Sequence, residues 1–334
     1  MIIPFFIPHS GCPHQCVFCN QKNIIGQSKP EDASTISGKI HRYRSTHTLG
    51  HSVEVAFYGG SFTALPLKTQ KRYLEAVQPF LQANQVHTIR LSTRPDCIDG
   101  EILTLLKSYH VQTIELGVQS MNDDVLALSG RGHTAADTVN SCTLLRQQGF
   151  SVGLQLMPGL PGDSEVTFRE TIGKVLELKP DNVRLYPVLV IKDTPLEELY
   201  KSRRYRPLTL GAAVSMCQEA AVRFEQHGIE VIRIGLLSTR ELEKPGTILA
   251  GPYHPAFRQL VESSIFRDKM RWALKNAGGR ITTAVFCVNP RDRSAVIGQK
   301  HENMIMIKKE FALDEITVRE DQNVPRRTLV LLNA

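Results

Sequence analysis

The chain has 334 residues, of which 42% are apolar, and a formal net charge of +7 at neutral pH. These values predict a globular protein with one large core or two smaller ones, and no run approaches the roughly 18 apolar residues of a membrane span. The modest basic excess is compatible with an anionic partner such as RNA, and equally with an ordinary soluble surface.

The chain opens on "MIIPFFIP", which contains two prolines and lacks the basic start of a secretory signal, so we interpret it as a first strand. Directly after it, Cys12, Cys16 and Cys19 lie within eight positions, whereas the other four cysteines are scattered. Thiols so close together do not form a disulfide framework and favour a reducing compartment. The sequence therefore predicts a cytoplasmic protein with metal-binding or catalytic cysteines.

Apolar, β-branched runs then alternate with segments that are long enough for a helix. The candidate strands cover residues 53–60, 87–96, 113–120, 151–159, 182–190 and 229–235. Candidate helices at 67–83, 99–110 and 163–180 are bounded by Asp, Ser, Gly or Pro. This alternation predicts an α/β fold with a parallel sheet, and six units before the strand at 229 fit a partial (β/α)6 barrel better than a flat doubly wound sheet.

The pattern changes past about residue 263. A basic amphipathic segment at 266–279 leads into what reads as a small strand–helix–strand tail. We therefore expect a core over residues 1–262 and a small C-terminal α/β extension over residues 263–334.

The cysteine cluster follows the first strand, at the carboxyl end where parallel α/β folds place their sites. Thiolates suit zinc or iron–sulfur clusters, and a [4Fe–4S] cluster normally takes one cysteine per iron, so three cysteines leave one iron open for a chelating substrate. The spacing leaves two alternatives open: a zinc site completed by His9 or His14, and three unrelated thiols. Phe18, between the last two cysteines, would pack over the cluster edge or fill the core.

The C-x3-C-x2-C spacing, with an aromatic residue before the last cysteine, resembles the signature of the radical S-adenosylmethionine (radical SAM) enzymes. Over residues 2–262 the chain resembles the radical SAM part of the Elongator catalytic subunit family and its shorter bacterial relatives; oxygen-independent coproporphyrinogen oxidase is a more distant likeness. Six segments in order carry the resemblance: "IPHSGCPHQCVFCNQ", "VAFYGGSFTALP", "LSTRPD", "IELGVQSMNDDVLALSGRGHT", "LMPGLPGD" and "RLYPVLVIKDTPLEELYKSRRYRPL". It implies a [4Fe–4S] cluster whose open iron chelates S-adenosylmethionine (SAM). An electron from a donor such as flavodoxin or ferredoxin would then cleave SAM reductively to a 5′-deoxyadenosyl radical.

The resemblance also implies a site for the methionine amino group of SAM. Gly59, Gly60 and Ser61 follow the second strand and match this site, where glycines let backbone carbonyls approach the ligand. Many members have an acid at the third position, so Ser61 would contribute backbone atoms. Without the cysteines, Gly-Gly-Ser after a strand would be an ordinary turn.

Four further residues are implied to contact SAM. Gln119 and Arg131, twelve positions apart, match the family's contacts to the ribose and to the methionine carboxylate, and arginine is well suited to a carboxylate. Gln155 matches another ribose-binding position, and Ser92 stands where this branch often has glutamate. Glutamines inside apolar strand runs are costly unless bonded, which independently favours a functional role for both.

The other four cysteines have no ligand spacing, and we interpret them as small core residues: Cys97, Cys142, Cys217 and Cys287. His133, His254 and Tyr186 are candidates to line the cavity. A bonded structural role is the alternative for each.

The substrate is less well defined by the sequence. The Elongator subunit acts on the wobble uridine of tRNA and has a fused acetyltransferase domain. This sequence contains no Arg/Gln-x-x-Gly-x-Gly/Ala loop for acetyl-CoA, so carboxymethylation chemistry does not carry over. The segment "YKSRRYRP", with Arg203, Arg204 and Arg206 among two tyrosines, is suited to phosphates and stacked bases, and a solvated helix end is the alternative.

The tail offers a second indication of RNA. Over residues 281–330 the chain partly resembles a KH domain, which clamps a nucleotide backbone over a Gly-x-x-Gly loop. The residues in KH register are Ile297, Gly298, Met304 and Ile307, with His301 in place of the second loop glycine. The expected phosphate contacts are Arg291, Arg293 and Lys300. A plain α/β cap over the open edge of the barrel is the alternative.

The sequence thus predicts a cytoplasmic radical SAM enzyme that modifies RNA, with tRNA as the expected partner and no membrane association. Two other functions stay open: a radical enzyme that acts on a small molecule or tetrapyrrole, and a non-catalytic iron–sulfur or zinc RNA-binding protein.

Overall fold

The chain divides into two compact units. The first comprises residues 1–209 and 223–253, and the second comprises residues 210–222 and 254–334. Across the helices that are described, none is both long and apolar enough to cross a membrane. The computed structural model describes residues 1–7, 11–25, 31–45, 52–278 and 281–333.

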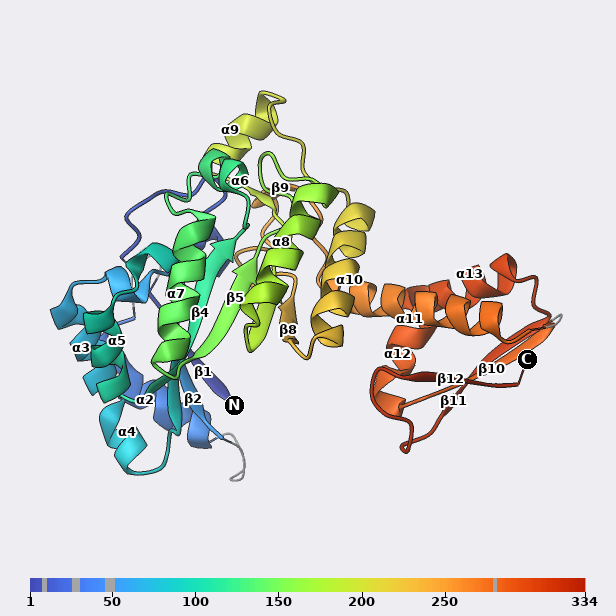
Figure 1. Ribbon diagram of the computed structural model, residues 1–334, viewed down its shortest axis with the longest axis horizontal. Helices are drawn as coiled ribbons and strands as arrows, with labels where there is room; N and C mark the ends of the chain where they lie inside the picture. Colours follow the sequence, from blue (N-terminus) through green and yellow to red (C-terminus); the bar gives the residue numbers. More distant parts are fainter. Residues whose placement is uncertain (8–10, 26–30, 46–51, 279–280, 334) are drawn as a thin grey trace. The chain divides into compact units, whose positions relative to one another are not determined.

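The first unit is built on a seven-stranded sheet in which every neighbouring pair is parallel. Its strands, in spatial order, are β1 (Ile2–Phe6), β2 (Glu54–Tyr58), β3 (Thr88–Thr93), β4 (Val111–Gln119), β5 (Ser151–Leu156), β6 (Asn182–Leu185) and β8 (Glu230–Ile234). Spatial order follows chain order, and the sheet curls into a half-barrel whose edge strands β1 and β8 do not pair (Figure 1). The predicted open α/β barrel is confirmed.

Helices connect the strands on the outer side of the sheet, and Figure 1 shows α7 and α8 lying across β4 and β5. The helical segments of the first unit are α1 (Gln21–Ile25), α2 (Ala33–Ser45), η1 (Phe62–Ala64), α3 (Leu67–Glu75), α4 (Gln78–Gln82), η2 (Pro95–Cys97), α5 (Gly100–Ser108), α6 (Asp123–Leu128), α7 (Ala135–Gln147), α8 (Glu165–Leu178) and α9 (Pro195–Lys201). They are followed by α10 (Leu210–Gln226), most of which belongs to the second unit. Two short strands, β7 (Val190–Ile191) and β9 (Ile248–Ala250), form a separate antiparallel pair.

Polar residues begin the predicted helices, as the sequence indicates. Asp99 accepts a hydrogen bond from the Ile102 amide at the start of α5, and Ser164 caps α8 in a reciprocal capping box with Thr167. The single helix expected over 67–83 is instead two helices, α3 and α4, because Pro79, which has no amide hydrogen, occupies the first turn of α4.

Alternation along the strands separates the core from the interior of the half-barrel. On β1, Ile3 and Phe5 are fully buried on one face, whereas Ile2, Pro4 and Phe6 line a cavity on the other. Because successive side chains of a strand point to opposite faces, every strand of the sheet offers one row to the helices and one row to this cavity. The polar strand residues discussed below belong to the second row.

The second unit combines helices with a small mixed sheet. Strand β10 (Thr283–Val288) is central, parallel to β11 (Glu315–Glu320) and antiparallel to β12 (Leu329–Asn333). Its further elements are α11 (Phe257–Asn276), η3 (Pro290–Asp292), α12 (Arg293–Ile297), η4 (Gln299–His301) and α13 (Glu302–Glu310). Its core contains Phe266, Met270, Leu274, Phe286, Val296 and Ile307.

The tail contains more helices and strands than the expected strand–helix–strand unit. Two helices, α12 and α13, separate β10 from β11, and a third strand follows. Gly298, whose φ of +78° is outside the helical region, ends α12 after five residues. The expected boundary between residues 262 and 263 falls inside α11, and the division of the chain at that point stays a prediction.

Candidate functional site

A cavity of about 1040 Å³ lies inside the half-barrel, entirely within the first unit. It is lined by the inner rows of the strands and by the loops that follow their carboxyl ends. Such cavities are the usual places for ligands in parallel α/β folds.

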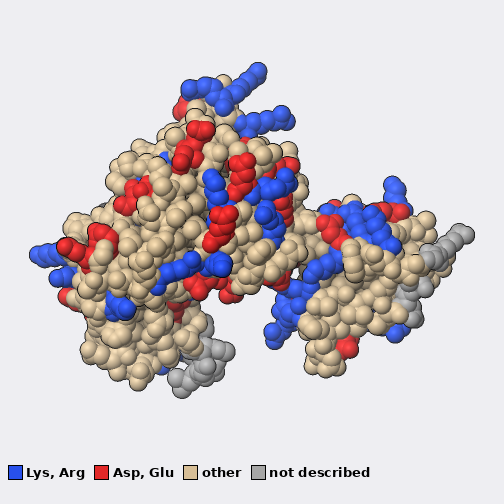
Figure 2. Space-filling view, in the orientation of Figure 1, with Lys and Arg blue, Asp and Glu red and all other residues tan. Residues whose placement is uncertain are grey.

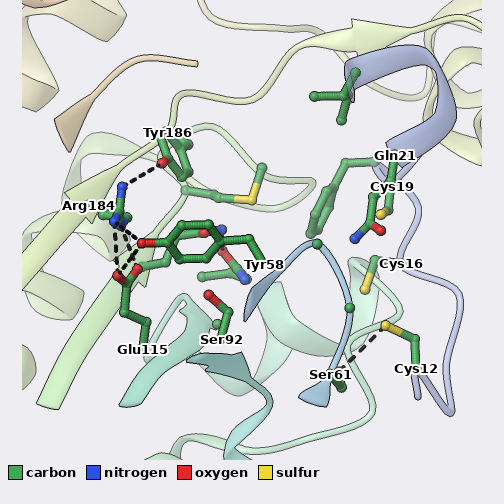
Figure 3. Close-up of a pocket in the computed structure, with 18 of the residues that line it drawn as sticks. Cys12, Cys16, Cys19, Gln21, Tyr58, Ser61, Ser92, Glu115, Arg184 and Tyr186 are labelled. Carbon is green, nitrogen blue, oxygen red and sulfur yellow. Dashed lines mark hydrogen bonds and ion pairs between the residues drawn. The ribbon is translucent and has the colours of Figure 1, made fainter. Parts of the chain in front are cut away.

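All three clustered cysteines line this cavity. They lie on the loop between β1 and α1, and Figure 3 shows the three sulfur atoms along one side of the cavity. The loop is tied to distant elements at Val17, whose amide donates to the Ser129 carbonyl at 3.1 Å and whose carbonyl accepts from the Leu196 amide at 2.8 Å. Two chain segments more than 100 positions away therefore help to hold the loop between Cys16 and Cys19 in place.

Glycines allow the cysteine loop to lie close to its neighbours. A Cβ atom on Gly11 would lie 2.3 Å from the Ser61 carbonyl oxygen, and one on Gly132 would lie 2.4 Å from the His14 ring. Both glycines also have positive φ values, of +73° and +72°. A side chain at Gly11 would displace the backbone of the loop, and one at Gly132 would displace the His14 ring.

Two polar contacts join the cysteines to residues predicted to bind SAM. The Cys12 and Ser61 side chains are 3.5 Å apart, and the Arg131 guanidinium donates a hydrogen bond to the Cys16 sulfur at 3.1 Å. Arg131 also donates to the Gly117 carbonyl, while its Nε is buried without a partner. Arg94, paired with Asp96 through two 2.9 Å bonds, donates to the Arg131 carbonyl and so holds that segment in place.

The donor set fits an iron–sulfur cluster. Burial, and then the neighbouring Cys16 and Cys12 thiols, raise the pKa of Cys19 to about 12, so three adjacent thiolates need a bound cation. Within the described ranges, no three His, Cys, Asp or Glu side chains are placed to ligate one metal ion. A [4Fe–4S] cluster instead takes each thiolate on a different iron, which three thiols along one wall provide. His9, named as a zinc ligand in one alternative, lies outside the described residues.

Every residue predicted to hold SAM lines the same cavity: Phe18, Gly59, Gly60, Ser61, Ser92, Gln119, Arg131 and Gln155. Gln155 donates to the Gln119 side-chain oxygen at 3.0 Å, so these two glutamines satisfy one another inside the barrel. Gln119 ends β4 with a φ of +70°, a conformation that non-glycine residues rarely adopt. The structure brings the eight residues together with the cysteines, and their individual roles stay predictions.

Of the three further candidates, only Tyr186 is among the residues that line the cavity. His133 is buried, with Nε2 3.2 Å from the Val118 carbonyl, and burial followed by the charges of Arg131 and Arg94 lowers its pKa to about 4. His254 belongs to the second unit. Of the four cysteines expected in the core, Cys142, Cys217 and Cys287 are buried and Cys97 is half-buried.

The basic segment at 200–207 differs from its expected use. Arg203, Arg204 and Arg206 are exposed, but Tyr205 is only 7% exposed and donates a hydrogen bond to the Gly159 carbonyl at 2.6 Å. Tyr205 packs in an apolar cluster because the chain turns inward after α9, and it cannot stack on a base. Tyr200 is the one tyrosine of this segment that is exposed.

Sequence reasoning missed a buried ionic network at the other end of the cavity. The Glu115 carboxylate accepts hydrogen bonds from Arg90 at 2.8 Å, from Arg184 at 2.9 Å and from the Tyr58 hydroxyl at 3.3 Å. Burial alone would raise the pKa of Glu115, but the hydrogen bonds and charges of the two arginines outweigh it and lower this pKa. The sequence did contain a signal for this network. Charged residues inside apolar strand runs are costly unless they are paired, just as glutamines there are costly unless they are bonded.

The network can span three strands because the middle strand, β5, has a glycine where the Glu115 side chain passes over it. Glu115 lies on β4 and Arg184 on β6, with β5 between them. A Cβ atom on Gly153 of β5 would lie 3.0 Å from the Glu115 side chain, so the absence of one lets the carboxylate cross to Arg184. In Figure 3, Arg184, Glu115 and Tyr186 lie on the side of the cavity away from the cysteines, with Tyr58 between.

Comparison with known proteins gives matches over most of the chain. Residues 6–175 match the Radical SAM superfamily, and residues 180–267 match the Radical SAM C-terminal domain. A tRNA uridine(34) acetyltransferase of Methanocaldococcus jannaschii is 29% identical over 250 residues, which cover 63% of this chain and 46% of that protein. Elongator complex protein 3 of Mus musculus is 33% identical over 192 residues, which cover 50% of this chain and 35% of that protein.

A solved structure shares the fold. The archaeal Elp3 of Methanocaldococcus infernus, with its N-terminus deleted, superposes with a TM-score of 0.65 at 21% identity, over 80% of this chain and 63% of that one. The chain spans about half the length, or less, of the two curated relatives described above.

Proposed function

Because the chain belongs to the radical SAM superfamily, we propose that it binds a [4Fe–4S] cluster through Cys12, Cys16 and Cys19 and cleaves SAM reductively. The observation that carries the proposal is the position of the three thiols. They share one cavity with Ser61, with Arg131 and with the other predicted SAM contacts. A site with cluster ligands and cofactor contacts on the same wall is what this chemistry needs.

The bound cluster would supply one electron to break a carbon–sulfur bond of SAM, giving methionine and a 5′-deoxyadenosyl radical. The chain's residues would bind and orient the cofactor. The backbone at Gly59 and Gly60 is open to the cavity for the methionine amino group, and Arg131 offers a guanidinium for its carboxylate. The electron would come from a small reductant such as flavodoxin or ferredoxin.

The proposed substrate is tRNA, in the cytoplasm. Support comes from the relatives, which are named for tRNA uridine(34) acetylation and for Elongator, although the matched region is about half of those proteins or less. Acyl transfer is therefore not proposed for this chain. On the face shown in Figure 2, basic and acidic side chains alternate over both units and form no single large basic field, so binding would depend on local contacts.

We propose that the C-terminal part of the chain contributes an RNA contact. From β10 to β11 the elements run strand, helix, loop, helix, strand, the order that the KH hypothesis requires. The loop contains Gly298, Lys300 and His301, all with positive φ, and it exposes Lys300 and His301 to solvent. Of the other expected phosphate contacts, Arg291 is exposed and Arg293 is paired with Glu320 at 3.0 Å.

Mass spectrometry of tRNA nucleosides from cells with and without this protein tests the substrate. We expect one modified nucleoside to be lost with the protein and restored by the wild-type gene, but not by a Cys16→Ala variant. Unchanged nucleosides would favour the second candidate function, a radical enzyme for a small molecule. The size of the cavity is the observation that keeps this candidate, since about 1040 Å³ holds SAM and a small substrate together.

A further inference from the structure

Arginines outnumber acidic residues in the wall of the cavity. The arginines that line it are Arg94, Arg131, Arg184 and Arg233. In the part of the chain that the structure describes, Glu115 is the one acidic residue that lines it. Positive side chains in a partly enclosed cavity are costly unless each meets an opposite charge or a ligand.

Three of the four arginines have a partner or an assigned ligand. Arg94 is paired with Asp96, and Arg184 is paired with Glu115. Arg131 lies beside the Cys16 sulfur, and the proposed function assigns it to the carboxylate of SAM. Arg233 is the fourth arginine, and none of these three assignments involves it.

Arg233 lies on β8 and is half-buried. Its Nε donates a hydrogen bond to the Gly235 carbonyl at 3.1 Å, and no carboxylate of the described residues lies within ion-pair distance of it. The remaining N–H groups of its guanidinium can therefore donate to a ligand in the cavity.

The sheet places Arg233 next to another arginine. Arg184 on β6 and Arg233 on β8 are paired positions on neighbouring strands, and both side chains face the cavity. Two positive side chains so placed repel each other unless an opposite charge lies close to both. Glu115 does not offset both, because it already serves Arg184 and Arg90, while Glu54 also pairs with Arg90. The carboxylates of Glu54 and Glu115 balance Arg90 and Arg184, and one positive charge is left on Arg233.

We propose that Arg233 binds an anionic oxygen group of the substrate, a phosphate or a carboxylate, at the end of the cavity away from the cysteines. Arg184 lies at this end in Figure 3, and its Nη1 donates to the Tyr186 hydroxyl at 3.4 Å, so the wall at this end carries two further polar side chains. The anion at this end would direct the rest of the substrate toward the SAM site. The inference rests on the proposed function in assigning Arg131 to SAM, and with tRNA as substrate the anion is a phosphate of the target nucleotide.

The test uses the cluster-reconstituted full-length protein with SAM bound. Uridine, uridine 5′-monophosphate and succinate are titrated into the wild type and into Arg233→Gln, Arg233→Lys and Arg240→Gln. Arg240→Gln is the matched control, because Arg240 is exposed and does not line the cavity. We expect one of the two anions to bind the wild type at least tenfold more tightly than uridine. That preference should be lost in Arg233→Gln, partly kept in Arg233→Lys and unchanged in Arg240→Gln, with equal cluster content and SAM affinity throughout.

The two anions distinguish the sources of the charge and separate this inference from the tRNA proposal. Preference for the nucleotide supports both. Succinate binding that depends on Arg233, without a nucleotide preference, supports the anion site and counts against tRNA as substrate. Equal binding of anions and uridine by the wild type, a preference that survives in Arg233→Gln, or no saturable anion binding up to millimolar concentration would overturn the anion site. Loss of a tRNA nucleoside in cells would still stand in those cases.

Discussion

The guanidinium of Arg131 donates a hydrogen bond to the sulfur of Cys16 at 3.1 Å, although 115 positions separate the two residues in the sequence. A residue predicted to hold the SAM carboxylate therefore touches a residue predicted to hold the cluster. The two predictions came from different segments, and their contact is the reason to treat them as one site.

Replacing Arg131 by Ala should weaken SAM binding while leaving the cluster in place. The side chain would lose a charge-assisted bond to the cofactor carboxylate, worth about 1.5–3 kcal/mol, or roughly a ten- to hundredfold loss of affinity. Equilibrium titration of SAM, with iron and sulfide analysis of each sample, measures both quantities. Arg131→Lys should recover part of the affinity. Unchanged SAM affinity in Arg131→Ala would show that the residue only supports the cysteine loop.

Replacing Glu115 by Gln should destabilise the first unit. The carboxylate is buried and shared by Arg90 and Arg184, so its removal leaves two guanidinium groups without that partner, at a cost of about 3–5 kcal/mol. Urea denaturation followed by circular dichroism gives the free energy of unfolding. Glu198→Gln is the control, because Glu198 forms only an exposed, 3.8 Å pair with Lys201 and should change stability by less than about 0.5 kcal/mol. Equal effects of the two substitutions would contradict the account of the network.

The same network predicts a dependence on pH. The pKa of Glu115 is lowered in the folded state, so its contribution to stability is complete above the ordinary carboxyl pKa and is lost as the pH falls through the lowered value. The free energy of unfolding of Glu115→Gln should therefore fall less steeply in acid than that of the wild type. Parallel curves for the two proteins would show that Glu115 has no lowered pKa.

The titration of His133 should change the free energy of unfolding in a higher pH range than the titration of Glu115 does. The pKa of His133 is lowered from 6.5 to about 4 in the folded protein. Between these two pH values the unfolded chain therefore binds a proton on His133, whereas the folded protein does not. Stability should be complete above pH 6.5 and fall between pH 6.5 and 4, by up to about 3 kcal/mol at the 1.36 kcal/mol that each pKa unit represents. His133→Gln should flatten this part of the profile, and the exposed His227→Gln should not. A profile that keeps its slope without His133 would place the titration elsewhere.

Binding of tRNA should depend on Lys300 and on salt. Phosphate contacts release counterions, so affinity falls as salt rises, with a logarithmic slope of roughly 0.7–0.9 for each contact. Lys300→Glu should weaken binding and reduce that slope. Lys309→Glu makes the same charge change at the other end of α13 and serves as the control. Salt-independent binding, or an equal loss in the control, would remove the loop from the RNA interface.

The alternation of strands and helices was sufficient to predict the parallel sheet and to place Cys16 and Ser61, which follow different strands, at the same edge of it. The selection of Ser61 and Gln119 as site residues came from the resemblance to the radical SAM enzymes. Buried polarity indicated that Gln119 and Gln155 need partners, and they form a hydrogen bond with each other; their predicted contacts to SAM stay predictions.

What could not be predicted depends on contacts between distant segments. In the sequence, Tyr205 belongs to a basic segment that is typical of a protein surface. Only the structure shows that Tyr205 is buried and donates a hydrogen bond to the Gly159 carbonyl. The ionic network required the crossing of Glu115 over Gly153, which no local pattern encodes. The strand–helix–strand pattern expected for the tail missed the break between α12 and α13, whereas the KH resemblance, with Gly298 in its loop, anticipated two helices.

Release of 5′-deoxyadenosine is the most direct test of the proposed chemistry. The protein, reconstituted anaerobically with iron and sulfide, should hold one [4Fe–4S] cluster and release 5′-deoxyadenosine from SAM when dithionite is added. Cys16→Ala should lose both cluster and product, whereas Cys97→Ala, which removes a half-buried thiol that does not line the cavity, should keep both. Zinc in place of iron, or a cluster-replete sample that releases no 5′-deoxyadenosine, would contradict the account.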